Sequence, residues 1–211
     1  MNIECIVVGP FEVNSYIAHR GAGGEALVID PGADADLLRD ALRRLRLRPA
    51  AYLLTHGHVD HVSALAALHR EWPAPVILHE LDAPWAFTPV NELPPYYAAP
   101  AAPAGAPCLV KDGEARTDGP FRYRVIATPG HTPGGVAFHL PDERVLFAGD
   151  TLFQGTVGRT DLPGGDARAL ARSVLQLGEL PDDTRVFPGH GPATTIGEEK
   201  RSNFFMHRAA S

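Results

Sequence analysis

The segment LLTHGHVDH, at residues 53–61, constrains this chain more than any other part of its sequence. Three histidines and an aspartate follow directly on an apolar run, and all four are ligand types for metals. In an extended segment, residues two positions apart point to the same side, so His56 and His58 can reach one cation together. The chain then begins a helix, from which Asp60 and His61 can face a second position nearby. Imidazole with carboxylate suits zinc, iron or manganese, so the segment predicts a metal site.

A related pattern recurs at three later strand ends. VIATPGH, VLFAGD and RVFPGH each run an apolar strand into a glycine-marked turn, and the ligand-type residues there are His131, Asp150 and His190. Glycine suits such sharp turns because it tolerates backbone angles that other residues avoid. Groups that leave several strand ends collect along one rim of a fold, so we expect these three residues to lie beside the 53–61 segment.

Hydrophobic periodicity predicts strands that alternate with helices in both halves of the chain. The expected strands lie near residues 3–9, 11–20, 25–32, 50–55, 75–80, 121–130, 134–140, 144–150 and 184–191, and the expected helices near 34–47, 62–72 and 166–180. This order predicts two sheets packed face to face with helices outside. Residues 84–107 break the pattern with seven prolines, which favours an extended insertion loop or linker. The other interpretation is a mobile wall beside a site, formed with Tyr96 and Tyr97.

Composition limits the classes of function. A chain of 211 residues, 45% of them hydrophobic, is long enough for one domain over residues 1–211 with a substantial core. A net charge of -6 argues against a protein that follows a nucleic-acid backbone. No apolar run approaches the roughly 18 to 20 residues of a membrane helix. The start of the chain lacks signal-peptide features, and only Cys5 and Cys108 are present, so we expect a cytoplasmic protein without disulfides.

The sequence resembles the metallo-β-lactamase superfamily over nearly its whole length. Besides THGHVDH, the resemblance rests on DPG at 30–32, GHT at 130–132, GD at 149–150 and PGHG at 188–191, which occur in family order. It implies an α+β fold of the four-layer αββα type, in which two mixed β-sheets are flanked by helices. It also implies a dinuclear metal site on the rim of that sandwich.

The resemblance also implies a role for each residue of the motifs. Two divalent ions are expected, with zinc favoured and iron or manganese as alternatives. The first would be bound by His56, His58 and His131, and the second by Asp60, His61 and His190, with Asp150 bridging both. Asp30 matches a residue outside the ligand set that helps to hold the ligand loops; the other interpretation is a turn aspartate before proline.

Within the superfamily the resemblance is to the short bacterial form of glyoxalase II, a hydroxyacylglutathione hydrolase without an added C-terminal helical domain. It rests on GRTDLPGGD at 158–166 and PGHGPATTIGEEKRSNFF at 188–205, where Phe204 replaces a proline usual in short-form relatives. The implied reaction is hydrolysis of a glutathione thioester such as S-D-lactoylglutathione to D-lactate and glutathione by a metal-bridging hydroxide. A bound cation lowers the pKa of its water from 15.7 to about 7, so no serine or cysteine nucleophile is needed. Asp60 is the candidate catalytic residue that orients this hydroxide, or else a ligand only.

The carboxylates of glutathione call for basic groups at the rim. Arg159, Lys200 and Arg201 are the candidates, with solvated surface charges as the other interpretation. The expected partner is a small molecule, with no nucleic acid and no membrane, and the chain is expected to be a monomer or a homodimer.

Four other functions stay open at this point. An iron-dependent persulfide dioxygenase of the same superfamily would use one iron, bound by the equivalents of His56, His131 and Asp150. A ribonuclease is disfavoured by the acidic charge balance. β-Lactam hydrolysis and a non-catalytic metal-binding module complete the alternatives.

Overall fold

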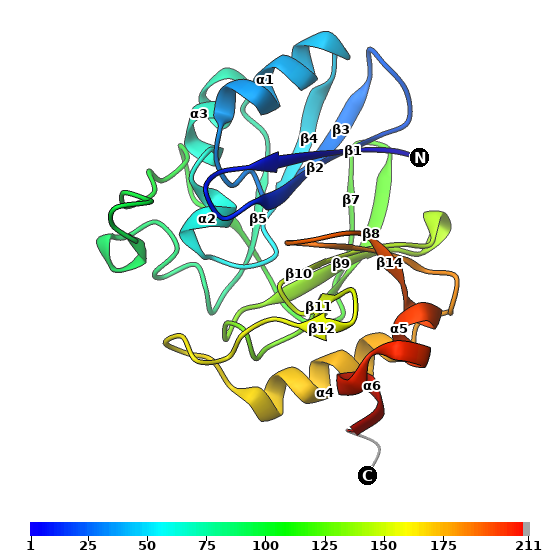
Figure 1. The fold of residues 1–211 in the computed structure, drawn as a ribbon. Coiled ribbons are helices and arrows are strands. Elements are labelled where there is room, and N and C mark those ends of the chain that lie inside the picture. The colour runs from blue at the N-terminus through cyan, green and yellow to red at the C-terminus, as the bar shows by residue number, and fades with distance from the viewer. Residues whose placement is uncertain (209–211) are drawn as a thin grey trace.

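The first sheet is built by the N-terminal half of the chain. In the computed structural model, which describes residues 1–208, this sheet has six strands in the order β1 (Asn2–Val8), β2 (Val13–His19), β3 (Glu25–Ile29), β4 (Arg48–Leu53), β5 (Val76–His79) and β6 (Cys108–Val110). The first three strands pair antiparallel, and the strands from β3 to β6 pair parallel. The first sheet is therefore mixed (Figure 1).

The second sheet comes from the C-terminal half. Its six strands run in the order β14 (Thr194–Thr195), β13 (Arg185–Pro188), β10 (Val145–Gly149), β9 (Val136–Leu140), β8 (Phe121–Ala127) and β7 (Ala115–Asp118). Strands β10 and β13 pair parallel and the other neighbours antiparallel. A separate hairpin of β11 (Leu152–Phe153) and β12 (Thr156–Val157) follows β10.

Three apolar clusters separate four layers. One lies between the first sheet and the helices α1 (Ala35–Arg44) and α3 (Leu65–Glu71), the second lies between the two sheets, and the third lies between the second sheet and α4 (Ala167–Gly178), α5 (Ile196–Ser202) and α6 (Phe204–Arg208). Figure 1 shows these helices at opposite sides of the paired sheets. The predicted α+β sandwich of αββα type, with two mixed sheets flanked by helices, is confirmed. None of the helices within residues 1–208 combines the length and the apolar composition of a membrane span.

The helix predicted over 62–72 is two helices. The first, α2 (Val59–Val62), is the helix start that was expected at Asp60 and His61. The helix is interrupted at Ala64, whose N–H donates to the carbonyl of Pro31 at 3.0 Å instead of to a carbonyl of the preceding helical turn. Because of this break, the short helix that carries ligand-type residues is oriented separately from α3, which covers the sheet.

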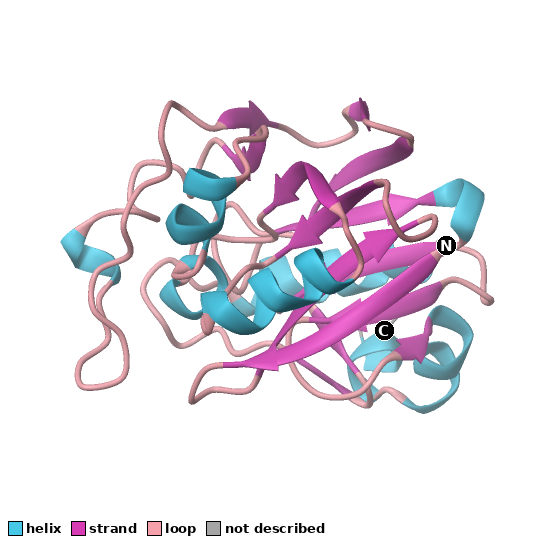
Figure 2. Ribbon diagram, turned by 90° about the horizontal axis from the view of Figure 1, so that it is seen from above, coloured by secondary structure: helices cyan, strands magenta, loops and turns pink. Residues whose placement is uncertain are grey.

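The proline-rich segment has little regular structure. Within residues 84–107 the only helix is the 3₁₀ turn η1 (Pro89–Asn91), and one isolated bridge joins Leu93 to Tyr97. Its rings nevertheless pack on the body of the protein, since Tyr96 and Tyr97 lie 5.2 and 5.5 Å from the ring of Phe11. Seen from above, long loops extend beyond one end of the strands (Figure 2).

Candidate metal centre

The candidate ligands all lie beyond strand ends at one edge of the sandwich. Strand β4 leads into His56 and His58, and α2 carries Asp60 and His61. In the second sheet, β8, β10 and β13 lead into His131, Asp150 and His190. These three strands run in the same direction, because β8 and β10 are both antiparallel to β9 and β10 is parallel to β13. Their carboxyl ends therefore meet at the same edge.

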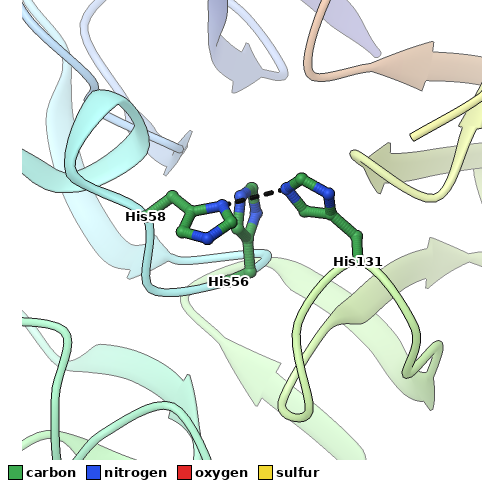
Figure 3. Close-up of side chains that lie close together, drawn as sticks. All are labelled: His56, His58 and His131. Carbon is green, nitrogen blue, oxygen red and sulfur yellow. Dashed lines mark hydrogen bonds between the residues drawn. The ribbon is translucent and has the colours of Figure 1, made fainter. Parts of the chain in front are cut away.

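The seven side chains converge into three overlapping groups. In each group the ligand atoms lie within 4.8 Å of one another, and the groups are His56–His58–His131, His56–His61–Asp150 and Asp60–His61–His190. Figure 3 shows the first group, in which His58 and His131 come from different loops and face each other. The Nδ1 of His58 and the Nε2 of His131 are 2.9 Å apart.

Asp150 lies between the groups with its two oxygens facing different partners. Its Oδ2 is 3.5 Å from Nε2 of His131, which belongs to the three-histidine group. Its Oδ1 is 3.5 Å from Nε2 of His61 and 3.1 Å from Nδ1 of His190, which belong to the other side. This is the arrangement that a carboxylate needs to bridge two cations.

The imidazoles of His56 and His61 are buried next to each other, with ring centroids 4.1 Å apart. Each residue is at most 2% exposed, and neither Nε2 has a hydrogen-bond partner among residues 1–208. An unsatisfied buried polar group costs about 1–3 kcal/mol. A coordinated cation would satisfy both atoms, so the donor set fits a metal centre.

The charges of the cluster are strongly coupled. Burial, together with the neighbouring His131, lowers the pKa of His58 to about 3, so this imidazole is neutral, as ligation requires. Burial acts to lower the pKa of His61 as well, but the carboxylates of Asp150, Asp60 and Asp30 outweigh it and raise that pKa to about 10. Without a cation, positive charge therefore accumulates on His61 beside the carboxylates.

Asp30 is placed to hold two ligand-bearing segments. It is buried directly after β3, and its Oδ1 and Oδ2 accept from the N–H and the hydroxyl of Thr55, each at 2.7 Å. Its Oδ2 also lies 3.1 Å from Nδ1 of His61. The carboxylate thus contacts Thr55, which precedes His56, and Nδ1 of the His61 ring. An aspartate that only shaped the turn before Pro31 would not need these contacts.

Of the three predicted basic residues, only Arg159 lies beside the cluster. Its carbonyl accepts from Nδ1 of His131 at 2.8 Å, while its guanidinium is exposed and pairs with Asp161 at 2.6 Å. The structure does not bring Lys200 or Arg201 to the histidines, because both lie near Asp182. The ammonium group of Lys200 contacts Asp182 at 2.7 Å, at the end of β13 opposite to the end that leads into the cluster. Strand β14 turns the chain back along β13, so closeness in sequence to the PGHG loop does not become closeness in space.

Sequence reasoning missed several side chains that support the cluster. Asp82 is buried and accepts from the N–H groups of Gly57 and Gly134 and from the hydroxyl of Thr132, at 2.7 to 2.9 Å. It thus ties the loop of His58 to the loop of His131. No local motif marks Asp82. Asn14, which is also buried, donates to carbonyls on both sides of His190. Unlike Asp82, it has a sequence signal, because the polar pair NS interrupts the apolar strand predicted over 11–20.

Aromatic rings and a glycine complete the walls. The ring of Trp85 lies 5.6 Å from that of His58, and the ring of Phe153 lies 6.1 Å from that of His190. Gly189 leaves no room for a side chain, since a Cβ there would lie 2.1 Å from Oδ1 of Asp150. The glycine of the PGHG motif is therefore required by close packing on the bridging carboxylate.

Comparison with known proteins agrees with this geometry. The family model described as "Metallo-beta-lactamase superfamily" matches residues 8–190. The Haemophilus influenzae protein named hydroxyacylglutathione hydrolase GloC is 37% identical, over 98% of this chain and 99% of its own length. The probable metallo-hydrolase YqgX of Bacillus subtilis is 36% identical over 95% of each chain.

Two solved structures are similar in both fold and sequence. The crystal structure of BLEG-1 B3 metallo-beta-lactamase is 40% identical, with a TM-score of 0.91 over 97% of this chain and 99% of that one. The structure of TTHA1623 in a di-iron-bound form is also 40% identical, with a TM-score of 0.84 over 96% and 99% of the two chains.

Proposed function

Because this chain belongs to the metallo-beta-lactamase superfamily, whose members include metal-dependent hydrolases, we propose that it hydrolyses a glutathione thioester such as S-D-lactoylglutathione. The main support for hydrolase activity is the presence of two complete ligand groups that Asp150 joins. The substrate class is supported by the 37% identity to the protein named hydroxyacylglutathione hydrolase GloC. The products would be D-lactate and glutathione.

The residues present would hold two divalent ions. His56, His58 and His131 would hold the first, Asp60, His61 and His190 the second, and Asp150 would contact both. We propose zinc, with iron as the main alternative given the di-iron form of TTHA1623. Bound there, the cations would lower the pKa of water to about 7 and polarise the thioester carbonyl.

The remaining chemistry needs little from the chain. The leaving thiol has a pKa near 8.5, so it departs as a thiolate without a dedicated acid. The carboxylate of Asp60 has a half-buried position beside His61 and His190, at 3.9 and 3.8 Å from their Nε2 atoms. From there it can serve as a ligand and accept a hydrogen bond from the attacking water.

Arg159 is the proposed contact for a substrate carboxylate. Its guanidinium is exposed beside the His131 loop and pairs with Asp161; a carboxylate of glutathione would take the place of Asp161. Arg159→Ala is expected to raise KM for the thioester up to about fivefold, as for an exposed ion pair, with kcat unchanged. The matched control is Lys200→Ala, which should leave KM unaltered. Steady-state kinetics of both variants check this, and the reverse ranking would refute the assignment.

The proposed activity is tested on purified protein by elemental analysis and by product release from S-D-lactoylglutathione. We expect two ions per chain and turnover that is lost on chelation and restored by zinc. Absence of thioester turnover in protein that holds both ions would overturn the substrate class while leaving the metal centre intact.

β-Lactam hydrolysis is the second candidate, because a structure titled as a B3 metallo-beta-lactamase matches at a TM-score of 0.91. A chromogenic cephalosporin therefore belongs in the same assay series. A persulfide dioxygenase would need only His56, His131 and Asp150 around one iron. The complete Asp60–His61–His190 group favours the hydrolase. Oxygen consumption with glutathione persulfide would instead support the dioxygenase.

A further inference from the structure

Asn91 binds the peptide groups on both sides of His58. Its Nδ2 donates to the carbonyl of Gly57 at 2.7 Å, and its Oδ1 accepts from the N–H of Val59 at 3.1 Å. The same Nδ2 donates to the carbonyl of Ala86 at 2.7 Å, within the proline-rich segment. Asn91 is only 7% exposed. This side chain therefore fixes the backbone on both sides of His58 to a residue 32 to 34 positions further along the chain, in a segment that composition alone describes as a loop.

Asn14 does the same for His190. Its Nδ2 donates to the carbonyls of Pro188 and Gly191, at 3.0 and 2.8 Å, so its two bonds enclose the PGH turn. Its backbone N–H also donates to the carbonyl of Gly189 at 2.7 Å. Asn14 lies in β2 of the first sheet and is 4% exposed. It thus anchors a loop of the second sheet to the first.

The two histidines held in this way belong to different ligand groups. His58 occurs only in the three-histidine group, and His190 occurs only in the group with Asp60 and His61. Each candidate metal position therefore has one ligand whose backbone is fixed by its own asparagine. Groups that orient ligands from outside the ligand set commonly change metal affinity by about 10- to 100-fold.

We propose that Asn91 and Asn14 are positioning residues that set the affinities of the two metal positions separately, Asn91 for the three-histidine position and Asn14 for the Asp60–His61–His190 position. The proposal rests on the proposed metal centre and not on the proposed substrate. It also gives part of the proline-rich segment a role, because Asn91 ends the 3₁₀ turn η1. Through Asn91, that segment becomes a support of one metal position.

Asn203 supplies a matched control. It is also buried, at 0% exposed, and its Nδ2 donates to the carbonyls of Phe153 and Thr156 and to the carboxylate of Glu199, at 3.4, 3.0 and 2.8 Å. These bonds hold the β11–β12 hairpin and enclose none of the ligand histidines. Removal of this amide should therefore destabilise the fold without weakening either metal position.

The experiment uses Co²⁺ as the probe, because its visible absorption reports ligand geometry without any substrate. His58→Ala and His190→Ala serve as references for loss of the first and second position. We expect wild-type protein to bind two Co²⁺. Asn91→Ala should bind one of the two about 10- to 100-fold more weakly, and the ion that stays tightly bound should give the spectrum of His58→Ala. Asn14→Ala should in the same way match His190→Ala. Asn203→Ala should keep both ions while its Tm falls.

Circular dichroism checks that each variant is folded. If an alanine variant does not fold, Asn91→Asp and Asn14→Asp replace it, because aspartate keeps the side-chain volume but lacks the N–H donors, and the same selective weakening is expected. The proposal is overturned if both asparagine variants weaken the same ion, if neither weakens any, or if Asn203→Ala loses metal equally. Wild-type protein that binds no Co²⁺ overturns the metal centre as well. Selective weakening in a protein without thioesterase activity supports the proposal and contradicts only the substrate.

Discussion

Replacement of His58 by alanine is expected to abolish thioester turnover while the chain stays folded. The imidazole of His58 is one of the three nitrogen donors of the proposed first metal position, and its Nδ1 lies 2.9 Å from Nε2 of His131. Changes to groups that only orient ligands already cost about 10- to 100-fold, so loss of a ligand itself should lower kcat/KM by more than about 100-fold. Kinetics with S-D-lactoylglutathione and the metal content per chain measure this.

The fold should tolerate the change because His58 belongs to none of the apolar clusters that separate the layers. His139→Ala is the matched control. His139 is also half-buried, but it lies within β9, away from the ligand groups. It should keep both ions and near-full turnover. Near-full turnover in His58→Ala would contradict the proposed mechanism directly.

The architecture could be predicted from sequence because its signals are local. Apolar strands that run into glycine turns and then into His131, Asp150 and His190 mark both the strand ends and the edge at which they meet. The 53–61 segment contributes four candidate ligands from positions close together in the sequence. Only the parallel and antiparallel order of the strands was needed to bring these groups together, and the sandwich provides it.

The contacts of the supporting residues could not be predicted, because the partners are distant in sequence. Asn14 donates to a carbonyl 174 positions away, and no spacing rule links two such residues. Asn91 lies in a segment whose composition describes a loop, and composition does not say which residue of a loop turns inward. The very short strand β14 was also missed. It reverses the chain, and this reversal takes Lys200 away from the cluster.

The change Asp30→Asn is expected to remove the second metal position although it adds no volume. Oδ1 of Asp30 accepts from the backbone N–H of Thr55, a donor that cannot turn away, so an asparagine must keep its oxygen there. Its NH₂ group then takes the place of Oδ2 and faces Nδ1 of His61. To accept that hydrogen bond, His61 must carry its own proton on Nε2, the atom that faces Asp60 and Asp150.

A protonated nitrogen cannot bind a cation, so Asp30→Asn should bind one ion where the wild-type protein binds two. The same tautomer error beside a catalytic imidazole costs about 10⁴-fold in kcat in a serine protease, and we expect a loss of at least about 10³-fold here. Metal analysis and kinetics measure the effect. Asp82→Asn is the control, because Asp82 is a buried aspartate whose hydrogen-bond donors include no imidazole. Asp82→Asn should lower Tm but keep the ion at the Asp60–His61–His190 position. Two bound ions and full turnover in Asp30→Asn would show that the Asp30 carboxylate does not set the tautomer of His61.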